Sequence, residues 1–336
     1  MARTGVSPVR LIHTGQHYDE AMSGAFFSDL GMKAPDEHLG VGSGTQAEQT
    51  SRLLLALEAS FQANRPDRVI VVGDVNSTLA AALAAAKLGI PVDHVEAGLR
   101  SWDRSMPEEI NRLVTDGVSD LLFVSEPDGA KNLRREGHDR GRIHFVGNVM
   151  IDSLRAILPR ARTRKAALAL GLRRRGYAIL TLHRPANVDD AAQLRRLIEG
   201  VAEAFAGLPI IFPVHPRTRP SLDQARLPPT LRAIAPLGYT DFISLLDGAM
   251  VAVTDSGGIQ EETTWLGVPC LTLRSNTERP ITVAAGTNTL VGDNLRSLSL
   301  AAGRIRKGTY KKGSRPELWD GRAADRIAAV YRRLRR

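Results

Sequence analysis

Residues 68–100 read Arg-Val-Ile-Val-Val-Gly-Asp-Val-Asn-Ser-Thr-Leu-Ala-Ala-Ala-Leu-Ala-Ala-Ala-Lys-Leu-Gly-Ile-Pro-Val-Asp-His-Val-Glu-Ala-Gly-Leu-Arg. An apolar run at 68–72 leads into an alanine-rich helical segment near 77–88, and a second apolar run follows at 92–95. Gly89-Ile90-Pro91 separates the helix from the second run, because glycine ends helices and proline cannot continue them. Strand, helix and strand in this order predict a βαβ unit with neighbouring parallel strands.

The same alternation continues over most of the chain. In the first half we expect strands at 9–13, 121–124 and 143–146, and helices at 46–63, 107–118 and 127–137. In the second half we expect strands at 178–182, 210–213, 251–254 and 270–273, and helices at 190–206, 241–248 and 258–266. The pattern predicts an α/β protein whose parallel sheets are covered on both faces.

The chain has 336 residues, which is too long for one doubly wound domain and fits two of about 150 residues each. We expect an N-terminal Rossmann-like domain at 1–150 and a second Rossmann-like domain at 151–319. Residues 160–176 are charged and contain no apolar strand, so the crossover is placed near 148–160. A final helix at 320–336 is expected to pack back on the first domain.

The composition narrows the class of protein. The single cysteine, Cys270, excludes an internal disulfide and a cysteine-rich metal site. No apolar run approaches the roughly 20 residues that span a bilayer, and the first residues lack the apolar core of a signal peptide. The formal charge of +9 lies largely in local runs, without a nucleic-acid-binding motif. We therefore expect a soluble cytoplasmic protein without a membrane or nucleic-acid partner.

Three carboxylates follow closely on one another in the first half. Asp74 comes after the strand at 68–73, and Glu96 comes directly after the strand at 92–95, where open α/β sheets bind ligands. Asp74 could instead cap the following helix, whereas Glu96 has no local helix to cap. Glu108 stands behind a proline at a helix start, a position that favours acids for structural reasons alone. If the three converge, they raise one another's pKa, which suits general acid and base catalysis.

Two histidines repeat the pattern in the second half. His183 and His215 stand at the ends of successive predicted strands, each near an arginine. A lone histidine is more often structural, but two in this arrangement favour an anion site.

Residues 254–262, Thr-Asp-Ser-Gly-Gly-Ile-Gln-Glu-Glu, carry the sharpest signal. A strand feeds the turn Ser256-Gly257-Gly258, which starts a helix whose free N–H groups and dipole can bind a phosphate. Glycine lets a ligand approach the backbone, and Glu262 can accept hydrogen bonds from ribose hydroxyls. The alternative is an ordinary capped helix. Arg279, after the next strand, could neutralise a diphosphate.

Taken together, these stretches resemble the non-hydrolysing UDP-N-acetylglucosamine 2-epimerases. They run in the family's order across nearly the whole chain, and the ordered set is specific although no single stretch is. The matching segments are Thr14-Gly15-Gln16-His17, Gly73-Asp74, residues 94–100, Pro107-Glu108-Glu109 with Asn111-Arg112, residues 255–262 and Thr277-Glu278-Arg279-Pro280.

The resemblance implies two Rossmann-like domains (the B-type glycosyltransferase fold) with a UDP-sugar in an interdomain cleft. It implies a homodimer without a redox cofactor or required metal, and reversible C2 epimerisation of UDP-N-acetylglucosamine to UDP-N-acetylmannosamine through 2-acetamidoglucal. By position, the residues that match the family's catalytic set are Asp74, Glu96, Glu108 and His183. The residues that match its UDP-binding set are Ser256, Gly257, Gly258, Glu262 and Arg279, with Phe242 near the uracil and His215 added from the strand-end pattern.

The sequence departs from the family at its start and after His183. The family begins with an apolar strand and a Gly-Thr-Arg-Pro-Glu loop, but here the strand at 9–13 corresponds to the family's second. The first strand is therefore missing, and because it is central in a Rossmann sheet its absence would leave a gap; we expect a misplaced or truncated start. Where the family commonly reads His-Arg-Arg-Glu, this chain has His183-Arg184-Pro185-Ala186.

Several other functions stay open on the sequence alone. They are a UDP-sugar glycosyltransferase of the same fold, a UDP-sugar-binding remnant with impaired catalysis, a hydrolysing epimerase, and an epimerase for another UDP-sugar such as a diacetamido uronic acid.

Overall fold

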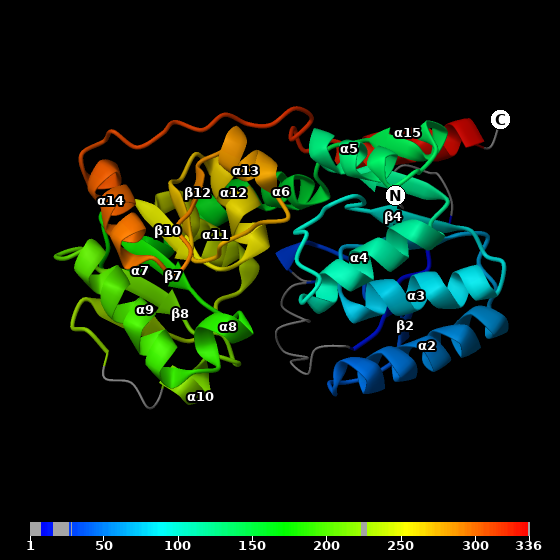
Figure 1. Ribbon diagram of the computed structural model, residues 1–336, viewed down its shortest axis with the longest axis horizontal. Helices are drawn as coiled ribbons and strands as arrows, with labels where there is room; N and C mark the ends of the chain where they lie inside the picture. The colour runs from blue at the N-terminus through cyan, green and yellow to red at the C-terminus, as the bar shows by residue number, and fades with distance from the viewer. Residues whose placement is uncertain (1–7, 16–26, 28, 223–226, 335–336) are drawn as a thin grey trace. The chain divides into compact units, whose positions relative to one another are not determined.

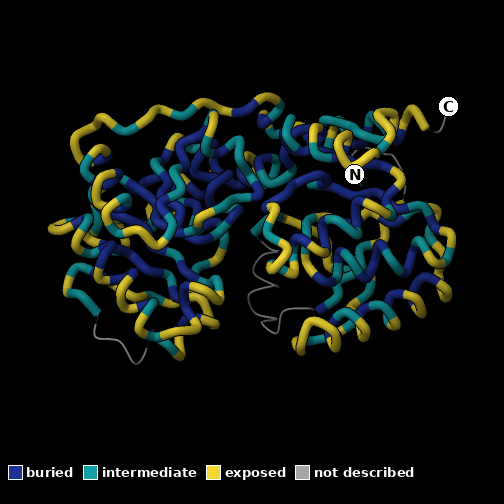
Figure 2. The backbone as a smooth tube through the Cα atoms, in the orientation of Figure 1, coloured by how far each residue is buried: buried dark blue, intermediate teal, exposed yellow. Residues whose placement is uncertain are grey.

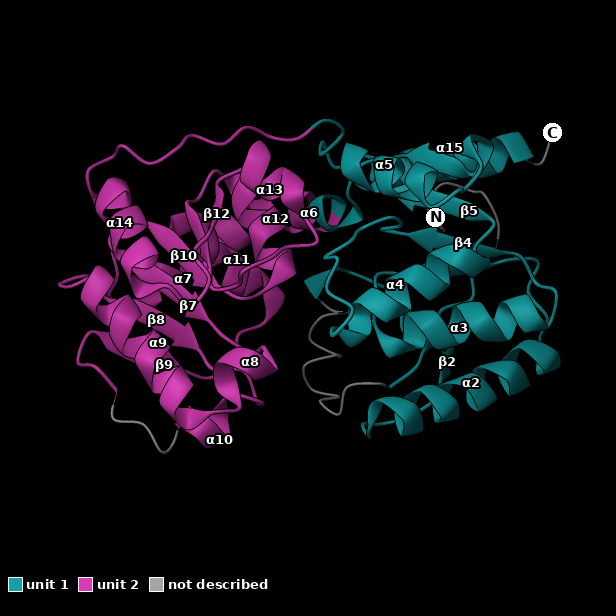
Figure 3. Ribbon diagram, viewed as in Figure 1, with its two compact units in different colours: residues 1–152, 317–336 teal, residues 153–316 magenta. Residues whose placement is uncertain are grey.

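The computed structural model describes residues 8–15, 27, 29–222 and 227–334. The chain divides into two compact units, each of which is described by itself (Figure 3). Unit 1 comprises residues 1–152 and 317–336, and unit 2 comprises residues 153–316. In both units the buried residues follow the strands, and the exposed residues lie on the outer faces of the helices and in the loops (Figure 2).

Unit 1 contains a parallel sheet in the order β3-β4-β5-β6. Its strands are β3 (Val69–Val72), β4 (Val92–Val95), β5 (Leu121–Val124) and β6 (Ile143–Phe145). The connecting helices are α2 (Gln46–Ala63), α3 (Asn76–Lys87), α4 (Pro107–Val118), α5 (Pro127–Arg135) and the short 3-10 turn η2 (Arg140–Arg142). The βαβ unit expected from residues 68–100 is confirmed, because β3 and β4 are parallel neighbours with Val72 opposite Val95.

Two further strands of unit 1 form a sheet of their own. β1 (Ile12–His13) pairs in parallel with β2 (Glu37–His38). The strand expected at 9–13 is thus shorter than predicted, because β2 offers only two residues to pair with. Within the described ranges no strand pairing joins β1 to β3, so the sheet is broken where the sequence analysis expected a gap.

The last helix, α15 (Ala323–Leu334), belongs to unit 1 (Figures 1 and 3), and its buried residues pack against Val95 of β4 and Phe123 of β5. The Oη of Tyr331 donates a hydrogen bond of 2.6 Å to the Asp93 carboxylate of β4. The first N–H groups of α15 donate to the carboxylate of Asp152. The indole of Trp319, which is almost fully buried, donates to the carbonyl of Ser125. The C-terminal segment is therefore part of the core of unit 1.

Unit 2 is built on a six-stranded parallel sheet in the order β12-β11-β10-β7-β8-β9. Its strands are β7 (Ala178–Thr181), β8 (Ile210–Pro213), β9 (Leu231–Ile234), β10 (Val251–Thr254), β11 (Cys270–Thr272) and β12 (Asn288–Leu290). Its helices are α7 (Ala166–Ala169), α8 (Pro185–Val188), α9 (Ala191–Ala204), α10 (Arg219–Leu222), α11 (Tyr239–Gly248), α12 (Gly257–Leu266), α13 (Pro280–Ala284) and α14 (Leu295–Arg306).

Some elements differ from the sequence-based expectation. The crossover placed near 148–160 is one continuous helix, α6 (Val149–Arg164), and the boundary between the units falls inside it. Pro159 and the charges around it obscure the helical pattern. The strands β9 and β12 were not expected; they are the edge strands of the sheet and have only four and three residues. Among the described residues, no helix combines the length and hydrophobicity needed to cross a membrane.

Candidate functional site

The three candidate carboxylates of unit 1 gather at the carboxyl edge of β3 and β4. Glu96 follows β4 directly, and Asp74 follows β3 after Gly73. The N–H of Gly73 donates to the carbonyl of Val95 over 3.1 Å, which keeps the two strand ends in register. Glu108 lies in the first turn of α4, whose next turn contacts the Asp74 loop.

α4 fixes Asp74 through two side chains. The Asn111 amide donates to the Asp74 carbonyl over 2.9 Å, and Nη1 of Arg112 lies 2.5 Å from Oδ2 of Asp74. Asn111 and Arg112 stand three and four residues after Glu108, so all three side chains share one helical face. The structure thus brings Glu108 to the same edge as the Asp74 carboxylate.

The backbone around each of the two carboxylates that follow a strand is distinctive. The N-cap of α3 is Val75, and no side chain caps it, so Asp74 does not serve as the helix cap that the sequence allowed. Glu96 adopts a left-handed backbone with φ of 72°. A non-glycine residue rarely adopts this conformation unless its surroundings impose it, and such residues cluster at functional sites.

A buried ion pair lies beneath the Glu96 loop. Nδ1 of His94 lies 2.6 Å from Oδ1 of Asp116, and its Nε2 lies 2.9 Å from the carbonyl of Gly73. Both partners are acceptors, so both ring nitrogens carry hydrogen and His94 is an imidazolium. Burial alone would lower the pKa of His94, but the Asp116 charge and hydrogen bond raise it above its ordinary value.

The other oxygen of Asp116 holds the far side of the same loop. It accepts from the N–H of Gly98 over 3.0 Å and lies 2.7 Å from Nη2 of Arg100. Arg100 also pairs with Glu136 over 2.6 Å. The loop that carries Glu96 is therefore anchored both before and after it, which explains how its left-handed backbone is maintained.

Glu109 has a structural role that separates it from Glu108. Its carboxylate is almost fully buried and accepts from the N–H groups of Ser101 and Trp102 and from Arg112. Burial would raise the pKa of Glu109, but these hydrogen bonds and the Arg112 charge hold it below its ordinary value. Arg112 therefore links a structural carboxylate to a candidate catalytic one, a role that the sequence did not reveal.

In unit 2, His183 is fixed by a buried aspartate. Asp255 is fully buried and accepts from the N–H groups of His183 and Arg184 and from the Asn187 amide. Nδ1 of His183 lies 2.9 Å from Oδ1 of Asp255, and the ring of His215 lies 5.5 Å from that of His183. Burial would raise the pKa of Asp255, yet the hydrogen bond and charge of His183 with the other donors hold it low. The sequence placed Asp255 in the motif without a role, and it missed Asn187.

The N-terminus of α12 has the turn predicted from the sequence, and Gly257 in it also contacts two charged side chains. Ser256 is the N-cap residue, and no side-chain hydrogen bond caps the helix, so the first N–H groups remain available to an anion. A Cβ at Gly257 would lie 2.5 Å from Nη1 of Arg279 and 2.7 Å from Oε1 of Glu278. A side chain at this position would therefore displace the ends of Arg279 and Glu278, which pair with each other. Gly258 lies in the same first turn.

Arg279 belongs to a buried cluster of charges. Its Nε lies 2.8 Å from Glu261, and its Nη1 lies 2.5 Å from Glu278. Arg274 also binds Glu278 over 2.8 Å, and Arg184 lies 3.8 Å from it. Burial would raise the pKa of Glu278, but the charges of Arg279 and Arg274 lower it strongly. Three cations against two carboxylates leave a net charge of +1 beside α12.

Glu262 is buried next to the aromatic residues of α11. Oη of Tyr239 donates to Oε1 of Glu262 over 2.9 Å, and Phe242 lies three residues after Tyr239 on the same helical face. Burial, with the nearby Glu261 charge, raises the pKa of Glu262 to about 8. The candidate ribose and uracil residues therefore lie on adjoining helices.

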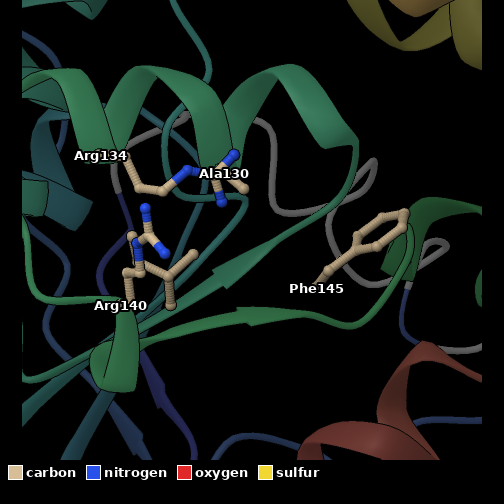
Figure 4. A pocket seen from close by; sticks show the side chains of 5 residues that line it. Ala130, Arg134, Arg140 and Phe145 are labelled. Carbon is tan, nitrogen blue, oxygen red and sulfur yellow. The ribbon is translucent and has the colours of Figure 1, made fainter.

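One cavity of unit 1 lies away from all these residues. It has a volume of about 410 Å³ and lies between α5 and β6, where Arg134 and Arg140 approach each other (Figure 4). No candidate site residue lines it. Two residues of the matching stretches, Gln16 and His17, lie outside the described residues.

The whole chain matches one protein family. A family model described as UDP-N-acetylglucosamine 2-epimerase matches residues 2–332. The chain belongs to this family. The curated UDP-N-acetylglucosamine 2-epimerase of Methanocaldococcus jannaschii is 42% identical over 331 residues, which cover 95% of this chain and 90% of that protein. The UDP-2,3-diacetamido-2,3-dideoxy-D-glucuronate 2-epimerase of Pseudomonas aeruginosa is 40% identical and covers 96% and 91%.

Solved structures of family members agree with the fold described above. The crystal structure of the Methanocaldococcus jannaschii enzyme in complex with UDP-GlcNAc and UDP superimposes with a TM-score of 0.88 at 41% identity, covering 96% of this chain and 91% of that one. The Neisseria meningitidis enzyme bound to UDP-GlcNAc gives a TM-score of 0.86 at 28% identity, covering 95% and 90%. The fold class expected from the sequence and the family assignment are therefore confirmed.

Proposed function

We propose that this chain reversibly interconverts UDP-N-acetylglucosamine and UDP-N-acetylmannosamine by inverting C2 of the sugar. The observation that carries the proposal is that Asp74 and Glu96 follow the neighbouring strands β3 and β4, while Asn111 and Arg112, on the same helical face as Glu108, hold Asp74. A chain of the epimerase family with several carboxylates at one edge has groups that can remove and return a proton. The Methanocaldococcus jannaschii relative, which is an epimerase for this sugar, supports the choice of substrate.

The chemistry of the sugar favours elimination. The C2 proton lies next to an amide nitrogen and is only weakly acidic. When the C1–O bond to UDP breaks, oxocarbenium character develops at C1, and this makes the C2 proton more acidic. A carboxylate takes the proton as UDP leaves with the bonding electrons, which gives 2-acetamidoglucal. Re-addition of UDP to C1, with a proton delivered to the other face of C2, completes the inversion. Asp74, Glu96 and Glu108 share these proton transfers.

Unit 2 supplies the groups that bind the nucleotide. The N–H groups of Gly257 and Gly258 in the first turn of α12, with the net positive cluster around Arg279, bind and stabilise the departing diphosphate. Glu262 accepts from ribose hydroxyls, and Phe242 lies against the uracil. His183, fixed by Asp255, and His215 provide a cationic or proton-carrying pair for the same ligand.

Proton NMR of UDP-N-acetylglucosamine with the protein in D2O tests the proposal. We expect deuterium at C2 together with a growing UDP-N-acetylmannosamine signal. Asp74→Asn should abolish turnover while UDP still binds, and Asp128→Asn, a matched change of an exposed carboxylate on α5, should leave turnover unchanged. Turnover by the Asp74 variant at the normal rate would remove Asp74 from the mechanism.

Other products in the same experiment would point to the alternative functions. Release of free N-acetylmannosamine would indicate a hydrolysing epimerase, and a product that needs an added acceptor would indicate a glycosyltransferase. Binding of UDP without exchange at C2 would indicate a protein that only binds the nucleotide sugar.

A second substrate is the UDP-linked diacetamido uronic acid. The similarity to the Pseudomonas aeruginosa relative, 40% identical, favours testing it alongside the first. The higher kcat/KM in parallel assays identifies the preferred sugar. We also propose that the chain is a homodimer, which light scattering of the purified protein tests.

A further inference from the structure

The cavity between α5 and β6 lies apart from the residues proposed for catalysis and nucleotide binding (Figure 4). Its volume of about 410 Å³ falls within the range of about 300–1,000 Å³ that small-molecule sites occupy. In the described part of unit 1, β6 is the last strand of the sheet β3-β4-β5-β6, so no further strand covers the cavity at this edge. A small molecule can therefore enter it from solution.

Part of the lining is apolar. Ile143 and Phe145 stand two residues apart on β6, so their side chains lie on the same face of the sheet. Both are partly buried and pack against the core cluster that includes Ala130 and Leu133 of α5. Ile143, Phe145 and Ala130 also line the cavity, so they offer apolar surface to a ligand.

Two arginines complete the lining and give it charge. Arg134 lies one turn after Ala130 on the same face of α5, and Arg140 begins the turn η2 that leads into β6. The side chains of both arginines reach into the cavity (Figure 4). Among the described residues, neither guanidinium has a hydrogen-bonding or ion-pair partner. Two cations at one cavity repel each other, and an anion bound between them removes that repulsion.

The acidic residues of the same stretch are engaged elsewhere. Glu136 pairs with Arg100 over 2.6 Å, and Asp128 pairs with Lys131 over 2.8 Å. Asp139 accepts a hydrogen bond from the backbone of η2 over 2.9 Å. These are the three carboxylates of residues 127–145, so the cavity keeps an excess of positive charge.

The two other arginines of this stretch have partners. The guanidinium of Arg135 lies over the ring of Trp102, 4.1 Å from its centroid. Arg142 donates to the carbonyls of Ser119 and Asp120. Arg134 and Arg140 are therefore the arginines of residues 127–145 that remain available to a ligand.

We propose that this cavity binds a phosphate monoester with an apolar body. The phosphate lies between Arg134 and Arg140, because a planar guanidinium can donate two parallel hydrogen bonds to its oxygens. A phosphate monoester carries a charge of about −1.5 to −2 near neutral pH, which balances two cations where a single carboxylate cannot. The apolar body covers Ile143 and Phe145. The inference does not depend on the proposed epimerase activity, since no residue proposed for that activity lines the cavity.

Phenyl phosphate is the probe, because it joins a phosphate to one apolar ring. It is titrated to about 10 mM, which fills a site whose Kd is in the low millimolar range or below. In two-dimensional NMR spectra of the labelled protein, the amide signals of Arg134, Arg140 and Phe145 should shift and reach saturation. Phenol lacks the phosphate and inorganic phosphate lacks the ring, so each should bind at least about tenfold more weakly. The amides of Gly257 and Gly258 report separately on phosphate binding at α12.

Three matched variants locate the ligand. Arg134→Gln and Arg140→Gln each remove one guanidinium and should weaken phenyl phosphate binding at least about tenfold. Arg332→Gln removes an exposed arginine of α15, which packs on the face of β5 that carries Phe123, whereas α5 covers the face that carries Leu122. This variant should bind as the wild type does. All three arginines are exposed, and the spectra of the free variants check that the fold is kept.

Four results would overturn the proposal. The first is the absence of a saturable shift at Arg134, Arg140 and Phe145 at about 10 mM phenyl phosphate. The second is binding of phenol or inorganic phosphate at these amides with the affinity of phenyl phosphate. The third is wild-type affinity in the Arg134→Gln or Arg140→Gln variant. The fourth is an equal loss in the Arg332→Gln variant, because the anion would then respond only to the overall positive charge.

Discussion

Replacing Asp116 with asparagine removes one negative charge from the network beneath Glu96 and keeps its shape. In the wild-type protein Asp116 pairs with His94 and Arg100, and the side chains of all three are fully buried. Asparagine can donate to a neutral His94 ring while its oxygen still accepts from Gly98 and Arg100. The hydrogen bonds can therefore survive, and the charge is what the substitution removes.

The expected loss of stability follows from the burial of the network. Removing one partner of a buried pair costs about 3–5 kcal/mol. Glu136 continues to pair with Arg100 in the variant, so the Asp116→Asn substitution should cost about 3 kcal/mol, near the lower end of that range. Asp116→Ala also removes the hydrogen bonds and should cost about 5 kcal/mol.

The pH dependence separates this explanation from a general packing defect. The folded-state pKa of His94 is raised above 6.5, so the folded protein holds this proton more tightly than the unfolded chain does. The resulting stabilisation is complete below about pH 6.5 and is lost as the pH rises through the raised pKa. Without the Asp116 charge, burial lowers the pKa of His94, and only the hydrogen bond to the Gly73 carbonyl and the Glu96 charge oppose it. The variant should therefore not show this loss above pH 6.5.

Urea denaturation between about pH 6 and 9 measures both quantities. In a Trp265→Phe background, the remaining tryptophans lie in unit 1, and buried Trp319 reports its unfolding. The Asp128→Asn variant serves as the control for removing an exposed carboxylate. If wild type and Asp116→Asn lose stability in parallel as the pH rises, His94 is not the group responsible and the reasoning fails.

Three other predictions concern backbone strain and buried groups. Gly98→Ala should cost more than about 3 kcal/mol, because its Cβ would lie 2.4 Å from the Gly129 carbonyl oxygen. Gly137→Ala, at a position where φ is also positive but the space is open, should cost about 1 kcal/mol. Equal costs of the two substitutions in urea denaturation would contradict this explanation. In the folded protein the pKa of Glu262 is raised from 4.5 to about 8, so unit 2 should lose stability as the pH rises between these values. In thermal melts, Glu262→Gln should abolish this dependence of stability on pH. Burial raises the pKa of the Cys270 thiol to about 11, so a thiol reagent should modify it only as fast as unit 2 opens; rapid modification of the native protein would refute this.

The helices and strands around Asp74, Glu96 and Glu108 could be predicted, because individual residues at their ends mark where they begin and stop. Gly89 and Pro91 separate α3 from β4, and Pro107 starts α4, so the predicted ranges match the structure to within a residue or so. The gathering of Asp74 and Glu96 followed from a general property of parallel sheets, namely that carboxyl ends meet at one edge.

The interactions that fix these residues could not be predicted in the same way. Asp116 lies 22 residues from His94, and their contact depends on how α4 packs against β4. The pairing of Arg279 with two buried carboxylates, Glu261 and Glu278, likewise depends on the turn into α13. The amino-acid composition of that turn does not predict this pairing. The edge strands β9 and β12 were missed because they have only four and three residues, too few for a periodic pattern to stand out from the loops around them.

Unit 1 is formed by two separate segments of the chain, and this has a consequence for synthesis on the ribosome. Unit 2 is a continuous segment, 153–316, but unit 1 needs residues 317–336 as well, which are translated after unit 2. A nascent chain that has just completed unit 2 lacks Trp319 and α15, so the core positions that they cover around Phe123 are exposed to water. Unit 2 can therefore mature first, while unit 1 waits in a form that chaperones and proteases can recognise until the final helix emerges.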